Sequence, residues 1–356
     1  MKLEFGSEKR FFDFVEGLND EDKVALISHI DLDGVAAAKV VNEAVKGEVV
    51  KFVNYEELND GLVQTLRERK INKIIFTDLY IGSKEFLTSL ESFAHVLILD
   101  HHIASEDWNS SKTVFIKVEE GYCATYLSYY LFSKVKNIEY LDWLVAGACI
   151  ADYCHIKVSD WLSRIYEKYE DSFEIQETYV RRSGKVWDLQ EALSLTIIYF
   201  KDKHDLNYVL NSIGCGFGEV GDLYAYATKV RGEIDLLVRL YQTERLSFPG
   251  GYLYEFSPNF GCGGMVSTIL SGQDSEKIVI TGRPGNEDDD SYYVSLRLQS
   301  RKQNMNDFLK KLLEGIPDSD GGGHIAAAGG HFPKRYLGEI KRRLGIEGLC
   351  VRFTLP

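Results

Sequence analysis

The sequence predicts an α/β fold in which a doubly wound, mostly parallel sheet is followed by a smaller second α/β domain, with a largely helical connector between them. Three observations support this prediction. Short apolar segments alternate with helical segments in the N-terminal part, the middle is helical and rich in aromatic residues, and strand-like segments return after Phe248. The length of 356 residues suits two domains of roughly 150 residues each.

The N-terminal domain is expected to consist of alternating strands and helices. The strand segments are apolar at nearly every position, which is typical of parallel strands that are covered on both faces. The expected strands are residues 24–28, 49–53, 73–77, 95–99 and 113–117, and the expected helices are residues 35–45, 62–70 and 84–93.

The rest of the chain changes character twice. Residues 122–246 have a helical pattern, and Tyr126, Tyr129 and Tyr130 are predicted to pack between helices rather than to stack on bases. Further strands are expected at 252–256, 277–281 and 292–298, the last two joined by an acidic turn at 284–290. The predicted division is 1–155 for the first domain, 156–246 for the connector and 247–356 for the second domain.

Composition and charge exclude several classes of protein. A net charge of −13 argues against a protein that coats polyanions in general. No apolar run approaches the ~20 residues needed to cross a bilayer, and the N-terminus lacks the apolar core of a signal peptide. The six cysteines form no CxxC pair, so reduced, mostly buried thiols and a cytoplasmic location are expected. Cys149, Cys154 and His155 could form half of a zinc site, but no second pair follows and buried thiols are favoured.

Acidic residues and histidines follow three of the predicted strands directly. They are His29, Asp31 and Asp33 after strand 24–28, Asp78 after strand 73–77, and Asp100, His101 and His102 after strand 95–99. A helical segment adds the carboxylate of Asp152. Because the carboxyl ends of parallel strands meet at one edge of a sheet, we expect these side chains to lie close together.

Such a cluster of carboxylates is costly in a low-dielectric cleft unless cations compensate it. Mixed carboxylate and imidazole ligands suit Mn²⁺, Mg²⁺, Zn²⁺ or Fe²⁺ better than a thiolate-binding metal. Enough ligands are present for two ions with one bridging carboxylate. Gly34 permits a tight turn into the following helix, whose N-terminus favours a nearby phosphate.

These motifs, in this order, resemble those of the DHH phosphoesterases. The matching residues are His29-Ile30-Asp31-Leu32-Asp33-Gly34, Asp78, Asp100-His101-His102 and Asp152. Residues 321–330 resemble the glycine-rich signature of the associated DHHA1 domain, and Ser295-Leu296-Arg297 resembles its strand-borne Ser-x-Arg. The resemblance spans nearly the whole chain and is least defined at residues 156–246.

The resemblance implies two Mn²⁺ ions as cofactors, for which Mg²⁺ or Co²⁺ could substitute. One ion would be bound by His29 and Asp31, the other by Asp33, His101 and Asp152, and Asp78 would bridge the two. His102 would then face the scissile phosphate, and Asp100 would orient the histidines.

The resemblance also implies a substrate-binding group in the second domain. A terminal phosphate or nucleotide would be bound by Arg297, His324 and the backbone of Gly321, Gly322 and Gly323. Consecutive glycines expose backbone N–H groups to an anion, and the small residues after His324 are expected to start a helix.

Two features depart from the family pattern. His29 lies closer to Asp31 than the first histidine does in many relatives, and this spacing resembles that of the archaeal RecJ-like members. Ala326 stands where a basic residue is common, which would weaken contacts with longer nucleic acid.

The function that the resemblance implies is that of a two-metal phosphodiesterase, a hydrolase acting on ester bonds. It would release nucleoside 5′-monophosphates from an end of single-stranded RNA or DNA or of short oligonucleotides, like RecJ-type exonucleases and nanoRNases. The strand would thread between the domains, and the acidic charge favours short oligonucleotides. A cyclic dinucleotide phosphodiesterase is the alternative enzyme, ahead of a pyrophosphatase.

A non-catalytic or partner-dependent subunit of a replication or repair assembly is the alternative from another class. No membrane partner is expected. A homodimer and a replication or repair partner are both compatible with the sequence.

Overall fold

The computed structural model describes residues 1–176, 179–201, 203, 205–285 and 290–346. The chain forms two compact units, residues 1–228 and 229–356. In the described part, no helix combines the length and apolar character needed to cross a membrane. The three-part division with boundaries after residues 155 and 246 stays a prediction.

The first unit contains the mostly parallel sheet that the sequence predicts. Its six strands have the order β1-β6-β5-β4-β2-β3, and β1 pairs antiparallel with β6 whereas the other pairs are parallel. The strands are β1 (Leu3–Phe5), β2 (Val24–Ser28), β3 (Val49–Phe52), β4 (Lys73–Thr77), β5 (His95–Asp100) and β6 (Thr113–Val118). The sequence did not predict β1, because three residues carry little periodic pattern.

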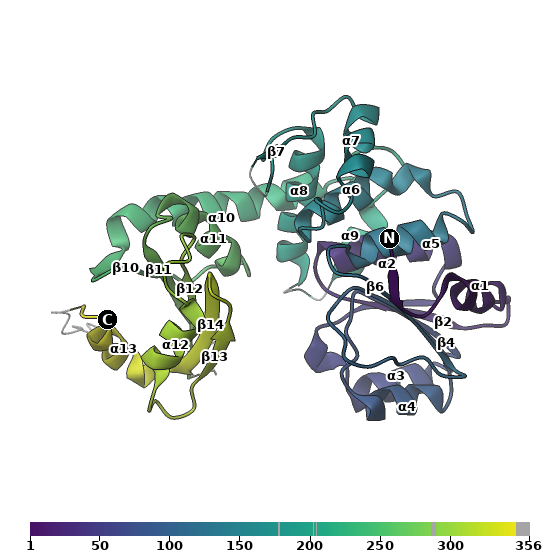
Figure 1. Ribbon diagram of the computed structural model, residues 1–356, viewed down its shortest axis with the longest axis horizontal. Helices are drawn as coiled ribbons and strands as arrows, with labels where there is room; N and C mark the ends of the chain where they lie inside the picture. The colour runs from purple at the N-terminus through teal and green to yellow at the C-terminus, as the bar shows by residue number, and fades with distance from the viewer. Residues whose placement is uncertain (177–178, 202, 204, 286–289, 347–356) are drawn as a thin grey trace. The chain divides into compact units, whose positions relative to one another are not determined.

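Helices cover both faces of this sheet, which confirms the doubly wound prediction (Figure 1). One face carries α1 (Glu8–Glu16), α2 (Leu32–Val45) and α5 (Ala124–Phe132), and the other carries α3 (Asp60–Glu68) and α4 (Lys84–Glu91). Successive strand residues point to opposite faces, so Leu26 packs in one hydrophobic cluster and Ile27 in the other.

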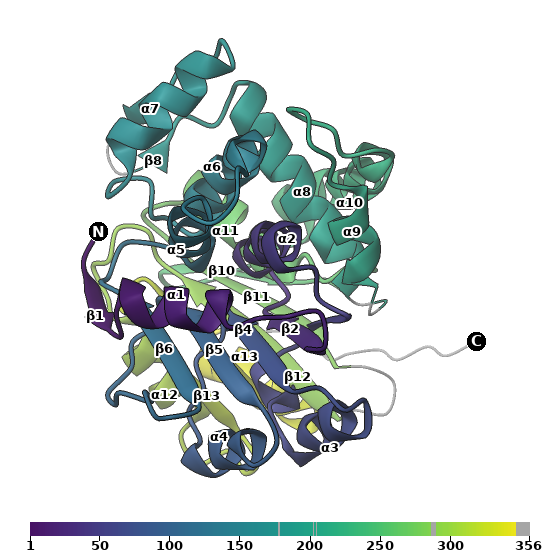
Figure 2. The same ribbon diagram turned by 90° about the vertical axis from the view of Figure 1, so that its right-hand side faces the viewer.

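The middle of the chain is helical, as expected. Its helices are α6 (Asp142–Ala151), α7 (Ser159–Lys168), α8 (Lys185–Lys201), α9 (Leu206–Ser212) and α10 (Leu223–Glu244). Figure 2 shows α6 to α9 on the same side of the sheet as α2 and α5. The rings of Tyr126 and Tyr129 pack against Trp161 of α7, which is the helix packing predicted for them. A short pair of strands, β7 (Ile175–Gln176) and β8 (Tyr179–Val180), was not predicted.

The second unit contains a mixed sheet with the strand order β13-β14-β12-β11-β10-β9. The strands are β9 (Leu246–Phe248), β10 (Gly251–Glu255), β11 (Ile278–Pro284), β12 (Ser291–Arg297), β13 (Asp320–Gly323) and β14 (Ala327–Pro333). The helices are α11 (Gly263–Gln273), α12 (Met305–Leu313) and α13 (Leu337–Arg343). Residues 286–289 of the expected acidic turn, and Cys350, lie outside the described residues.

The glycine-rich segment corrects one expectation, because the residues after His324 form a strand rather than the start of a helix. Gly321 pairs with Gly330, and Gly323 pairs with Ala328, in an antiparallel hairpin. A Cβ atom built at Gly323 would lie 2.3 Å from the carbonyl oxygen of Ala327. The small residues therefore permit close backbone approach, and strand pairing overrides the helical preference of alanine.

Candidate metal centre

Three neighbouring strands of the first sheet carry the motif residues. β5, β4 and β2 are adjacent and parallel, so their carboxyl ends lie at one edge of the sheet. This arrangement brings the residues that follow the three strands together, as the sequence predicts.

The first group of candidate ligands consists of His29, Asp31 and Asp78, whose ligand atoms lie within 4.8 Å of one another. His29 Nδ1 lies 3.1 Å from Asp31 Oδ2 and 3.6 Å from Asp78 Oδ2. Asp31 caps α2, because its Oδ1 accepts a 3.0 Å hydrogen bond from the N–H of Gly34. A Cβ at Gly34 would lie 2.3 Å from the His29 carbonyl oxygen, so this turn requires glycine.

The second group consists of Asp33, His101 and Asp152, again within 4.8 Å. The Asp33 side chain is 2% exposed and accepts hydrogen bonds of 2.8 and 2.9 Å from the backbone N–H groups of Ala124 and Thr125. His101 Nε2 lies 3.8 Å from Asp33 Oδ2, and its Nδ1 lies 3.6 Å from Asp152 Oδ2. Asp152 is the C-cap residue of α6, so a helix end and a strand end meet at this group.

Asp78 lies between the two groups. Its Oδ1 is 3.2 Å from His101 Nε2, and its Oδ2, which is buried and lacks a hydrogen-bond partner among the described residues, faces His29. The backbone of Asp78 has a left-handed φ of 58°, and its N–H donates to the Leu99 carbonyl of β5. A non-glycine residue in this conformation indicates a turn that the surrounding structure holds in place. One oxygen of Asp78 is therefore directed towards each group.

A second line of contacts joins Asp100, His102 and Tyr55. His102 Nδ1 lies 2.8 Å from Asp100 Oδ1, and His102 Nε2 lies 3.2 Å from the Tyr55 hydroxyl. The sequence analysis did not identify Tyr55. Tyr55 follows the carboxyl end of β3, as the candidate ligands follow the ends of β2, β4 and β5. A search of strand ends that included uncharged polar side chains would have found it.

The electrostatics of the cluster favour a bound cation. Burial and the nearby Asp33 carboxylate raise the pKa of Asp78 well above its usual value, and the same two causes raise the pKa of Asp152 to about 8. Burial opposes protonation of His29, but the adjacent carboxylates outweigh it and raise its pKa to about 9. A bound divalent cation would stabilise the ionised form of these carboxylates and displace their protons. The donor set of aspartates and histidines fits two such cations.

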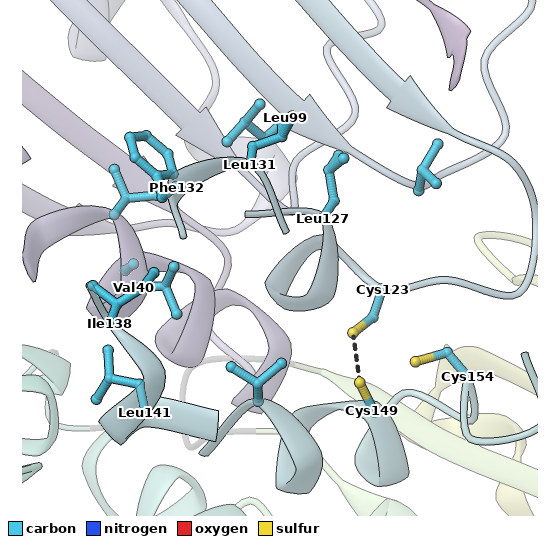
Figure 3. Close-up of a cluster of buried hydrophobic side chains, with 14 of the residues drawn as sticks. Val40, Leu99, Cys123, Leu127, Leu131, Phe132, Ile138, Leu141, Cys149 and Cys154 are labelled. Atoms are coloured by element: carbon cyan, nitrogen blue, oxygen red, sulfur yellow. Dashed lines mark hydrogen bonds between the residues drawn. The ribbon is translucent and has the colours of Figure 1, made fainter. Parts of the chain in front are cut away.

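Three buried cysteines lie next to residues of this centre in the chain. The Sγ atoms of Cys123, Cys149 and Cys154 lie within 4.8 Å of one another, with 3.8 Å between Cys123 and Cys149 (Figure 3). Cys123 directly precedes the α5 residues that donate to Asp33, and Cys149 and Cys154 flank Asp152. Among the described residues this group does not include His155, and its three cysteines are buried. The preference for free thiols over a zinc half-site stays a prediction.

The second unit brings its predicted residues to one end of a hairpin. Arg297 pairs with Ala327 across β12 and β14, and the His324 N–H donates a 2.7 Å hydrogen bond to the same Ala327. Gly322, Gly323 and His324 are exposed. Their binding of a phosphate stays a prediction.

A pocket of about 360 Å³ opens beside the candidate ligands. His29, Asp31, Asp33 and Asp152 line one side of it. The other side includes residues of α8 that the sequence analysis did not single out: Ser194, Ile197, Ile198 and Lys201. Their spacing of three and four residues does not differ in sequence from that of an ordinary core-facing stripe.

Comparison with a family model supports the identity of the second unit. Residues 256–344 match the model described as the DHHA1 domain. No curated protein matches the chain.

Several solved structures share the fold of the whole chain. RecJ from Thermus thermophilus in complex with Mn²⁺ has a TM-score of 0.64 at 14% identity, covering 97% of this chain and 54% of that chain. This chain thus spans about half of that RecJ. An exonuclease RecJ bound to manganese has a TM-score of 0.63 at 15% identity and coverages of 97% and 94%. PggH from Vibrio cholerae, a pGpG-specific phosphodiesterase, has a TM-score of 0.52 at 14% identity and coverages of 90% and 97%.

Proposed function

We propose that the chain is a Mn²⁺-dependent phosphodiesterase of the DHH/DHHA1 phosphoesterase family. Its DHHA1 domain and its fold support its assignment to this family. It releases nucleoside 5′-monophosphates from an end of short or single-stranded oligonucleotides.

The observation that carries this proposal is the pair of ligand groups that Asp78 joins. His29 and Asp31 would hold one cation, Asp33, His101 and Asp152 would hold the other, and Asp78 would bind both. Two divalent cations supply charge stabilisation at the attacking and leaving oxygens of an in-line displacement at phosphorus.

The remaining residues position the substrate and the ligands. Asp100, which is buried, fixes the ring of His102 at Nδ1, so that Nε2 stays directed towards Tyr55 at the exposed side of the centre. The N–H groups of Ala124 and Thr125 hold Asp33 in one orientation. In the second unit, Arg297 and His324 bind a phosphate of the substrate by charge and hydrogen bonding.

Short linear substrates are favoured by three observations. PggH is described as specific for pGpG, a linear dinucleotide, and RecJ is described as an exonuclease. The net charge of −13 disfavours extended binding of a polyanion. Ala326 provides no cation beside the glycine hairpin.

The test is a digestion series with purified protein and Mn²⁺. The substrates are end-labelled RNA and DNA from dinucleotides to long single strands, together with cyclic di-AMP, and EDTA-treated protein is the control. Mononucleotide release that depends on Mn²⁺ supports the proposal, and a preference for dinucleotides sharpens it. Cleavage of cyclic di-AMP alone would favour the alternative enzyme. Inactivity on every substrate with the metal bound would favour a non-catalytic role.

A further inference from the structure

One face of α8 lines the pocket beside the metal centre. Ile197 and Ile198 lie three and four residues after Ser194, and Lys201 lies four and three residues after them, so the four side chains share one side of the helix. All four line the pocket that His29, Asp31, Asp33 and Asp152 also line. The helical middle of the chain therefore contributes to the candidate active site.

Packing holds α8 in this place. A Cβ atom at Gly147 of α6 would lie 3.3 Å from Gln190 Cβ, so the glycine allows the two helices to approach closely. Ile197 belongs to the same buried cluster as Leu32, which lies between Asp31 and Asp33. Because Asp152 is the C-cap of α6 and Asp31 is the N-cap of α2, the helices next to the ligands also pack against α8.

The chemistry of this face matches one nucleotide. Ile197, Ile198 and Ile30 give the pocket apolar lining, and the Ser194 hydroxyl and the Lys201 ammonium add polar groups. The volume of about 360 Å³ lies near the lower end of the range of about 300–1,000 Å³ for small-molecule sites. A single nucleoside monophosphate is of that scale, and it combines an apolar base and sugar edge with an anion.

Lys201 is the informative residue of the four. It is half-buried and lines the same pocket as three aspartates, yet within the part of the chain that the structure describes its Nζ forms no ion pair or hydrogen bond. The two cations of the proposed mechanism would neutralise most of the charge of the carboxylates. A lysine at that position then has the incoming phosphate as its natural partner, since lysine binds phosphate as a mobile point charge.

We infer that the α8 face of Ser194, Ile197, Ile198 and Lys201 is a nucleoside monophosphate subsite of the metal centre, in which Lys201 binds a phosphate oxygen and the isoleucines contact the nucleoside. This inference rests on the proposed function, because it assigns the substrate unit that the same centre holds.

Binding of 5′-AMP and of adenosine to the Mn²⁺-loaded protein, measured by calorimetry, tests the inference without requiring turnover. Lys201→Gln keeps the length of the side chain and removes its charge. We expect it to weaken AMP binding about ten-fold or more, because a charged hydrogen bond is lost, and to leave adenosine binding unchanged. Lys201→Arg should retain most of the affinity. Lys203→Gln is the matched control, since Lys203 is exposed and lies over the Tyr199 ring, and it should change neither affinity.

A second variant tests the apolar wall. Ile198→Trp should fill part of the pocket and weaken the binding of AMP and adenosine alike, while the stoichiometry of bound Mn²⁺ stays at the wild-type value.

The inference is overturned if the wild type binds no AMP, if Lys201→Gln weakens the binding of AMP and adenosine equally, or if Ile198→Trp leaves both affinities unchanged. AMP binding that depends on Lys201, in a protein that hydrolyses no phosphodiester, would sustain the subsite and contradict the proposed function. Phosphodiester hydrolysis that does not depend on Lys201 would sustain the proposed function and contradict the subsite.

Discussion

The two predicted sites of this protein are built in opposite ways. At the edge of the first sheet, buried charges converge from several elements, and Asp33, Asp78 and Asp100 are almost completely shielded from solvent. At the hairpin of the second sheet, Gly322, Gly323 and His324 are exposed and the backbone sets the geometry. The first site is organised by carboxylate and imidazole side chains. The second depends on glycines, whose lack of a side chain lets the strands approach closely.

This difference indicates where each site is vulnerable. Solvent cannot reach a buried carboxylate to replace the neighbouring groups that it loses. Substitutions at the first site should therefore abolish phosphodiester hydrolysis. An exposed phosphate-binding residue shares its task with the backbone and with water, so changes at the second site should weaken binding by degrees. The predictions below test this contrast, beginning with the largest expected effect.

The substitution Asp78→Ala should produce the largest loss. It removes the side chain that faces both ligand groups, so we expect activity to fall at least about a thousand-fold and bound Mn²⁺ to drop below two ions per chain. Elemental analysis and kcat measurements check this, with Asp160→Ala, an exposed acidic residue of α7, as the control. Retention of more than a few per cent of the activity would remove Asp78 from the bridging position.

The affinity for Mn²⁺ should rise steeply with pH. Asp152 has a pKa raised to about 8 in the metal-free protein, and its proton must leave before the carboxylate can bind a cation. Protonation of Asp152 alone should lower the affinity roughly 50-fold between pH 8 and pH 6. Calorimetry in buffers of different ionisation enthalpy would detect the released protons. Asp152→Asn should bind Mn²⁺ more weakly and with a flatter pH profile, and an affinity that does not change with pH would contradict the proposed electrostatics.

The glycine hairpin offers a test within three consecutive residues. A Cβ atom at Gly321 would lie 2.7 Å from Leu309 Cδ2, and one at Gly323 would lie 2.3 Å from a carbonyl oxygen, whereas one at Gly322 meets nothing within 4 Å. We expect Gly321→Ala and Gly323→Ala to lower the free energy of unfolding by about 1–3 kcal/mol. Gly322→Ala is the matched control and should change it by less than ~0.5 kcal/mol. Denaturant unfolding measures all three. Equal losses at the three positions would show that the hairpin does not depend on this packing.

The substitution His324→Ala should have the smallest effect. His324 is exposed at the end of the hairpin, where water competes, so a hydrogen bond to a phosphate should contribute about 1.5 kcal/mol, the lower end of the range for charged groups. We therefore expect KM to rise several-fold with kcat unchanged, because the contact is the same in the ground state and the transition state. His331→Ala, on the adjacent strand β14, is the control. A collapse of kcat at constant KM would show that His324 acts on the transition state.

Much of this molecule follows from local sequence pattern. The strands 24–28, 73–77 and 95–99 are apolar throughout, and parallel strands place their carboxyl ends at one edge, so the meeting of His29, Asp78 and His101 was predictable. The alternation of strands and helices predicted the layers in the same way. The aromatic residues of the middle segment were predicted to pack between helices, because their spacing is helical.

The tertiary structure decided the features that have no local signal. Thr125 and Ala124 hold Asp33 through backbone N–H groups, which carry no side-chain signature in the sequence. Ser194 and Lys201 belong to a helical stripe whose spacing suits a core position as well as a pocket wall. The residues after His324 form a strand because β12 offers a partner for pairing, and this long-range interaction outweighs the local preference of alanine for a helix. The sequence by itself determined the candidate ligands, because the apolar strands and the acidic and histidine residues that follow them can be recognised locally. Only the tertiary structure decided what surrounds that centre, because its neighbours come from segments whose packing depends on contacts far apart in the chain.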